Sequence, residues 1–135
     1  MTDAGLPLNP LWVLLGDYSR DYGRVAAAAL FSEGNRPTAV LACSDYIAIG
    51  ILQAARQMGL VIPQDLSLVG FDDSPFAELV DPALTTVRQP IGEMGRLAFS
   101  RLLALMTNGD APPLTRLPVE LIIRQSVRKL GEPSQ

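Results

Sequence analysis

Short apolar runs alternate with longer helical segments along the chain, and this alternation constrains the fold more than any other feature. Each run is four to six residues of continuous apolar or β-type sequence, which is typical of buried strands. The runs are 11–15, 38–43 and 66–71, and the helical segments after the first two are 20–33 and 45–58. A short helix follows the third run, with Ser74 as its cap and Pro75 at its first position. Three consecutive strand–helix units predict an α/β fold with a parallel sheet.

The second half of the chain adds a further strand, a long helix and a last strand. Residues 84–87 are β-type, 90–107 form the longest helical segment, and 117–123 are predicted as the final strand. The helix over 90–107 is apolar around much of its circumference.

Composition excludes several classes of function. The 135 residues include 11 basic and 14 acidic side chains, a net charge of −3, and no basic run, so DNA binding by these residues is not expected. No histidine and one cysteine exclude His-based triads, His metal sites and an internal disulfide. We therefore predict no metal, no cofactor and no catalytic residue. The longest apolar run, 25–31, is too short to cross a bilayer, so we expect a cytoplasmic protein without membrane contact.

Polar side chains follow the three predicted strands at the point where each strand ends. Residues 17–19 follow the first, Ser44 and Asp45 follow the second, and Asp72 and Asp73 follow the third. Ligands of parallel α/β sheets bind outside the carboxyl ends of the strands. The sequence therefore predicts a pocket with carboxylates, a hydroxyl and the aromatic ring of Tyr18.

Several motifs at these junctions, in order and correctly spaced, resemble one known family. The segments are Ser44-Asp45-Tyr46-Ile47-Ala48-Ile49-Gly50, the run from Gly59 to Asp73, and Pro82-Ala83-Leu84-Thr85-Thr86-Val87-Arg88-Gln89-Pro90. They resemble the effector-binding half of LacI/GalR-type bacterial transcription regulators. The resemblance implies a three-layer, Rossmann-like subdomain of a periplasmic binding protein type I-like fold, in which two subdomains clamp a small molecule.

The resemblance also implies a division of the chain. Residues 5–127 correspond to a partial effector-binding domain, namely its distal subdomain, and 88–110 to a crossover helix that belongs to a missing proximal subdomain. The resemblance therefore implies that part of the apolar surface of this helix stays exposed. Residues 128–135 are expected to be a flexible tail. In the family, DNA is bound only through an N-terminal helix-turn-helix domain, which this chain lacks.

The resemblance assigns ligand contacts to four residues. Tyr18 would stack on the effector, a sugar or nucleobase-like molecule, and Asp72 would accept hydrogen bonds from its hydroxyl or N–H groups. Ser44 and Gln89 would add polar contacts. For each residue the alternative is a local role in its loop. Asp45 and Asp73 are expected to be structural, with Asp45 satisfying free N–H groups at a helix start.

Three further residues are singled out on the helix over 45–58, which is apolar on more than one face. The resemblance implies a homodimer interface that includes Ile47, Ile51 and Ala54, and the alternative is full burial inside the fold. Elsewhere, Cys43 is expected to be a buried filler and Arg124 to form an ion pair.

The function that the resemblance implies is non-catalytic sensing of a small molecule, most simply a sugar, by part of a LacI-type regulator. One alternative is a fragment of a periplasmic sugar-binding protein used in transport. The other is a hydrolase with Asp45 and Asp72 as an acid and base pair.

Overall fold

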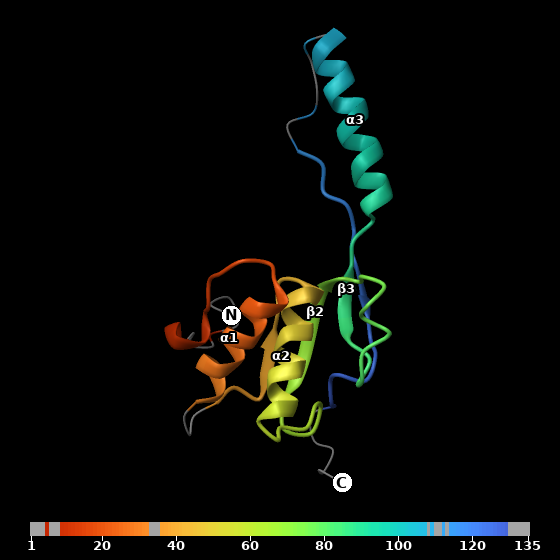
Figure 1. Ribbon diagram of the computed structural model, residues 1–135. Helices are drawn as coiled ribbons and strands as arrows, with labels where there is room; N and C mark the ends of the chain where they lie inside the picture. Colours follow the sequence, from red (N-terminus) through yellow and green to blue (C-terminus); the bar gives the residue numbers. More distant parts are fainter. Residues whose placement is uncertain are drawn as a thin grey trace.

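A four-stranded sheet forms the centre of the computed structural model, which describes residues 9–32, 36–107 and 114–129, and residues 5, 109 and 112. The strand order is β1 (Ala39–Leu41), β2 (Ser67–Asp72), β3 (Thr85–Arg88), β4 (Glu120–Ile122). β1, β2 and β3 are parallel, and β4 pairs with β3 in the antiparallel direction (Figure 1). The predicted α/β fold with a mainly parallel sheet is confirmed.

Two helices, α1 (Arg20–Phe31) and α2 (Asp45–Gln57), pack closely against each other, and α2 also contacts β2. A serine begins each helix: the Ser19 hydroxyl accepts from the Tyr22 N–H at 3.0 Å, and the Ser44 hydroxyl accepts from the Tyr46 N–H at 3.2 Å. Both capping hydroxyls satisfy N–H groups that have no partner within the helix.

Glycines allow the close crossing of α1 and α2. A Cβ atom on Gly23 would lie 2.2 Å from the Ile47 carbonyl oxygen, and one on Gly50 would lie 2.1 Å from the Arg20 carbonyl oxygen. Since real Cβ atoms do not approach backbone oxygens so closely, the helices meet at a distance that only glycine permits.

Burial explains why α2 is apolar on more than one face. One face packs on the sheet and another on α1, so Ile47, Ile51 and Ala54 are only 8%, 2% and 4% exposed. These side chains are therefore not available as a dimer surface. The predicted homodimer interface is wrong at these three residues, and the alternative, burial inside the fold, is what the structure shows. The largest fully buried apolar side chains of the core are Leu66, Leu68 and Leu84.

The run 11–15 does not form the predicted buried strand. Asn9 accepts a hydrogen bond from the Leu11 N–H at 3.0 Å, and Pro10 stands at the first position of a 3₁₀ turn over Pro10–Trp12. These local signals favour a helical turn at the start of the run. The rest of the run pairs with no strand, and Leu15 is 91% exposed.

Three smaller predictions also fail. The helix expected after Ser74 is only a series of turns over 75–79, because the Ser74 hydroxyl has no hydrogen-bond partner among the described residues and does not cap it. The last strand is shorter than predicted. Cys43 is exposed, because β1 ends at Leu41 and Cys43 lies beyond it.

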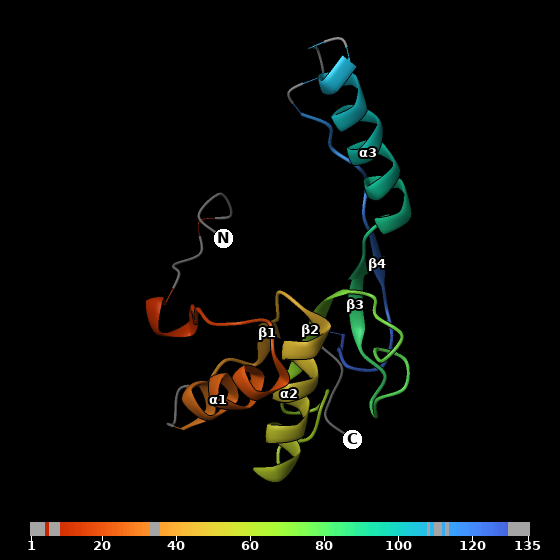
Figure 2. The same ribbon diagram turned by 45° about the horizontal axis from the view of Figure 1, so that its top comes forward.

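α3 (Ile91–Thr107) projects away from the sheet as an arm, with the segment that leads to β4 beside it (Figures 1 and 2). None of its residues is buried, and Phe99 and Met106 are 69% and 76% exposed. The expected exposure of its apolar surface is confirmed. α3 falls within the predicted crossover segment 88–110, whereas residues 130–135 of the predicted tail lie outside the described residues.

The Gly50→Ala substitution should destabilise the fold by about 1–3 kcal/mol, because the new methyl group collides with the backbone of α1. Gly92→Ala is the matched control: nothing lies within 4 Å of a Cβ there, and the change should raise stability by up to about 1 kcal/mol in an exposed helix. Urea unfolding of both variants measures the difference. Equal stability of the two would contradict the proposed close crossing.

Replacing Phe99 and Met106 together with glutamine should lower both the fluorescence of a dye that binds apolar surface and the self-association of the chain. Glutamine keeps the helix propensity of α3 high. Val25→Gln on α1, where Val25 is 66% exposed, is the control for a single scattered apolar residue. The expectation is contradicted if the chain without substitutions is a monodisperse monomer and binds little of the dye.

Candidate functional site

Parallel pairing places the ends of β1, β2 and β3 at one edge of the sheet, the edge from which α3 projects (Figure 1). At this edge the first residue of α2, Asp45, is hydrogen-bonded to the loop after β2. Asp45 accepts a hydrogen bond from the Ser74 N–H at 2.6 Å on one carboxylate oxygen and one from the Thr86 hydroxyl at 2.6 Å on the other. Its side chain does not cap its own helix, because Ser44 does.

Asp72, the last residue of β2, lies at this edge with an unusual backbone conformation. Its φ is 110° and that of Asp73 is 52°, a region that side chains other than glycine rarely adopt. The Gln89 side-chain amide donates a hydrogen bond to Asp72 Oδ1 at 2.8 Å. The structure therefore brings together two of the four predicted ligand residues, and one oxygen of Asp72 has no hydrogen bond among the described residues.

Asp73 is held by two arginines. Arg88 Nε lies 2.6 Å from Asp73 Oδ2 and Arg124 Nη2 lies 2.7 Å from Oδ1, so the expected ion pair of Arg124 is confirmed. Burial of Asp73 would raise its pKa, but the hydrogen bonds and positive charges of Arg124 and Arg88 outweigh burial and hold the pKa below its ordinary value of 3.8. Asp73 is thus fixed as a charged side chain.

Ser44 lies at the same edge but is covered. Its side chain is 3% exposed, and its oxygen accepts the α2 cap hydrogen bond from Tyr46. The observed role of Ser44 is therefore the cap of α2.

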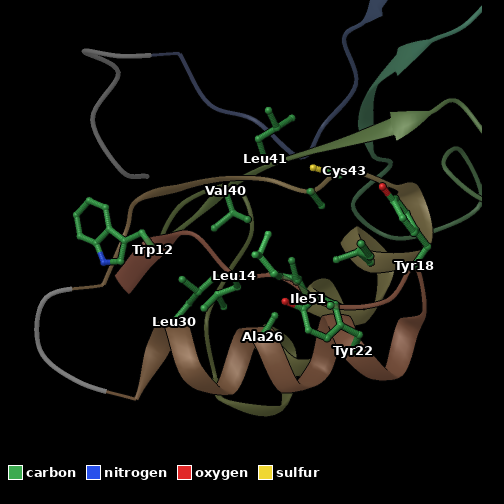
Figure 3. A pocket seen from close by; sticks show the side chains of 14 residues that line it. Trp12, Leu14, Tyr18, Tyr22, Ala26, Leu30, Val40, Leu41, Cys43 and Ile51 are labelled. Carbon is green, nitrogen blue, oxygen red and sulfur yellow. The ribbon is translucent and has the colours of Figure 1, made fainter. Parts of the chain in front are cut away.

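Tyr18 is 71% exposed and stands apart from the Asp45–Asp72–Gln89 cluster, to which no hydrogen bond of the described residues joins it. It lines an apolar cavity of about 170 Å³ between residues 12–18, α1 and β1. Figure 3 shows Trp12 at one end of this cavity and Tyr18 at the other, the end where Cys43 lies. Tyr18 also borders a groove of about 500 Å³ with Tyr46.

Aromatic rings extend from this groove toward the Asp72 loop. The centroids of the Tyr46 and Phe76 rings lie 6.0 Å apart at an interplanar angle of 56°, and Phe76 belongs to the turn after Ser74. Such a tilted pair is favourable for two aromatic rings. Tyr46 is thus the ring between the side of the site that carries Tyr18 and the side that carries Asp72.

Sequence reasoning missed two residues of this cluster, Thr86 and Arg88. Thr86 is fully buried and bonds Asp45, whereas a threonine in a strand ordinarily indicates only β propensity. Arg88 bonds Asp73 across 15 positions in sequence, a contact that only the pairing of β2 with β3 creates.

Neither a cluster of metal ligands nor a membrane-spanning helix is found among the residues that the structure describes. No three His, Cys, Asp or Glu side chains there lie close enough together to hold a metal ion. Likewise, no helix within the described ranges has the length and apolar character needed to span a membrane.

Residues 1–127 match the family of periplasmic binding protein-like domains. The chain belongs to this family. It is 38% identical over 131 residues to the ribose operon repressor of Haemophilus influenzae, which covers 96% of this chain and 40% of that protein. The chain therefore spans about 40% of the length of the curated relatives that it matches.

Solved structures of the same family agree. A LacI family transcriptional regulator from Mycobacterium smegmatis superposes with a TM-score of 0.84 at 33% identity, over 93% of this chain and 48% of that one. The transcriptional regulator CelR, in complex with cellobiose, superposes with a TM-score of 0.85 at 32% identity, over 93% of this chain and 38% of that one. The resemblance to LacI-type regulators is confirmed.

The Asp73→Asn variant of this periplasmic binding protein-like domain should lose less stability in acid than the unmodified chain. A carboxylate with a lowered folded-state pKa stabilises the fold above its unfolded pKa of about 3.9, and this contribution is lost as the pH falls through the lowered folded-state value. Urea unfolding at about pH 5 and about pH 3 measures the difference.

Asp21→Asn is the control, because the Asp21 side chain is 91% exposed and its oxygen lies 3.6 Å from Arg24. It should keep the acid dependence of the unmodified chain. The role of Asp73 is contradicted if Asp73→Asn also keeps the full acid dependence.

Proposed function

We propose that this chain is part of the effector-binding domain of a LacI-type transcription regulator and binds a small molecule, most simply a sugar, without chemical reaction. The observation that carries the proposal is the pair of Asp72 and Gln89 at the carboxyl edge of a parallel sheet. Ligands of such sheets bind at this edge. Two relatives support the class of ligand: one is named for a ribose operon, and another was solved with cellobiose.

The groups at the edge suit a polyhydroxylated ligand. Asp72 accepts one hydrogen bond from Gln89, and a carboxylate has acceptor capacity for neighbouring sugar hydroxyls as well. The exposed ring of Tyr18 would cover an apolar face of the sugar, whereas the buried Ser44 would contribute by capping α2 behind the site. A nucleobase-like effector would use the same groups through its ring face and N–H donors.

The regulatory step follows from differential binding. An effector that binds one conformation better shifts the protein toward that conformation. In this proposal DNA is contacted through another domain, since the present chain carries a net charge of −3 and no basic run. A homodimer and a cytoplasmic location belong to the same proposal, with a dimer surface other than Ile47, Ile51 and Ala54.

The hydrolase alternative fails on the environment of Asp45. The residue is 0% exposed and both carboxylate oxygens are hydrogen-bonded inside the fold, so it cannot exchange a proton with a substrate. The transport alternative uses the same fold and edge, and the similarity to a named repressor favours the regulator.

Asp72→Ala and Tyr18→Ala should each weaken binding of D-ribose, D-galactose, cellobiose or hypoxanthine, whichever binds the unmodified chain. Loss of hydrogen bonds to a charged group costs about 1.5–3 kcal/mol, which is roughly ten- to a hundredfold in affinity. NMR titration at high ligand concentration is the measurement, because it detects weak binding.

Asp21→Ala on the exposed surface of α1 is the control and should bind like the unmodified chain. Equal binding by the two site variants and the control would refute the assignment of this site.

A further inference from the structure

The loop that presents Asp72 needs support from outside itself. Asp72 and Asp73 have φ values of 110° and 52°. Positive φ is uncommon for residues other than glycine, and the value at Asp72 lies outside the left-handed helical region that aspartate tolerates. A loop in such a conformation persists only where surrounding groups fix it. The ion pairs of Asp73 hold its side chain but not the N–H groups of the loop.

Two buried side chains bond those N–H groups. Asp45 Oδ2 accepts from the Ser74 N–H at 2.6 Å, and the Thr86 oxygen accepts from the Asp73 N–H at 3.3 Å. The Thr86 hydroxyl then donates to Asp45 Oδ1 at 2.6 Å. The Thr86 hydroxyl thus both accepts and donates, and each oxygen of the Asp45 carboxylate accepts one hydrogen bond, as buried polar groups require.

The surrounding fold leaves room for this carboxylate. Asp45 and Thr86 are both 0% exposed, so no water competes for their hydrogen bonds. A Cβ atom on Gly70 would lie 2.3 Å from Asp45 Oδ1, so β2 accommodates the carboxylate only because residue 70 is glycine. α2, β2 and β3 therefore all contribute to one arrangement behind the loop.

We infer that Asp45 and Thr86 are positioning residues of the ligand site, which hold the Asp72–Ser74 loop in the conformation that presents the Asp72 carboxylate. Neither residue faces the ligand. Their role as ligand-site residues rests on the proposed function, whereas their control of the loop conformation does not. Because Asp45 directly follows Ser44, the same bonds also fix the loop after β1 relative to the loop after β2.

The test compares Thr86→Val with Thr85→Val. Valine keeps the shape of threonine and removes the hydroxyl. Thr85 is the matched control because it is the neighbouring residue of the same strand, is 2% exposed, and accepts a hydrogen bond from the backbone N–H of Arg124 rather than from an N–H group of the loop. Thr86→Ser restores the hydroxyl and should behave like the unmodified chain.

The measurements are NMR hydrogen exchange at the Asp73 and Ser74 amides and the short amide-to-Hα distance that marks positive φ at Asp72 and Asp73. In Thr86→Val the two amides should exchange about tenfold faster or more, relative to the core amides, and the short distances should lengthen. Thr85→Val should leave both readouts unchanged. Equal effects of Thr86→Val and Thr85→Val, or no effect of either, would overturn the inference.

A measurement on the unmodified chain covers the case in which Thr86→Val does not fold. The Thr86 hydroxyl proton should exchange slowly enough to give its own NMR signal, because it is buried in a bond to a carboxylate. A hydroxyl proton that exchanges with water at the rate of an exposed threonine would overturn the inference. Since no ligand is used, these results are independent of the success or failure of the effector titration.

Discussion

Parallel pairing of β1 with β2 and of β2 with β3 is the constraint on which the site depends. It brings the ends of three strands to one edge, although the residues that follow them are separated by up to about a third of the chain. The polar residues after each strand then meet. Asp45 from the first loop bonds Ser74 in the second, and Gln89 after β3 bonds Asp72 at the end of β2.

Two neighbouring aspartates at this edge differ in what surrounds them. Asp73 lies between two arginines and its side chain is 8% exposed, so its charge is neutralised by ion pairs within the fold. Asp72 has only a neutral amide as a partner and keeps an oxygen free of hydrogen bonds among the described residues. This difference, rather than their position in sequence, separates the carboxylate that we propose contacts a ligand from the one that stabilises the loop. Arg88 and Gln89, which bond these two aspartates, lead directly into α3.

The sequence predicted the parts of the fold that local signals determine. Strands near 39–41, 67–72 and 85–88 follow from apolar runs, and α1 and α2 begin at the capping residues Ser19 and Ser44. The meeting of Asp45 with the loop that carries Asp72 and Asp73 followed from their positions after parallel strands, whereas residues 17–19 follow no strand of the sheet. The prediction of a strand at 11–15 was wrong, because an apolar run does not specify whether a neighbouring strand pairs with it.

Other features depend on contacts between distant segments. Ile47 and Ile51 are buried because α1 crosses α2 at two glycines, and nothing in the pattern of α2 alone distinguishes that contact from a dimer. Thr86 bonds Asp45 across 41 positions, so its role becomes visible only once β3 stands beside β2. Within the site, local sequence therefore predicted which residues gather, and tertiary structure decides what each one does.

A nitroxide label on Cys43 tests most directly whether residues 17–19 and the loop after β2 lie at the edge where β1 ends. Cys43 is the single cysteine of the sequence and is exposed, so the label requires no substitution. The account predicts that the strongest NMR broadening falls together on residues 17–19 and 72–75, with weaker broadening at the far ends of α2 and α3. Broadening near Tyr18 that leaves residues 72–75 sharp would show that the loops do not share one edge, and would contradict the account.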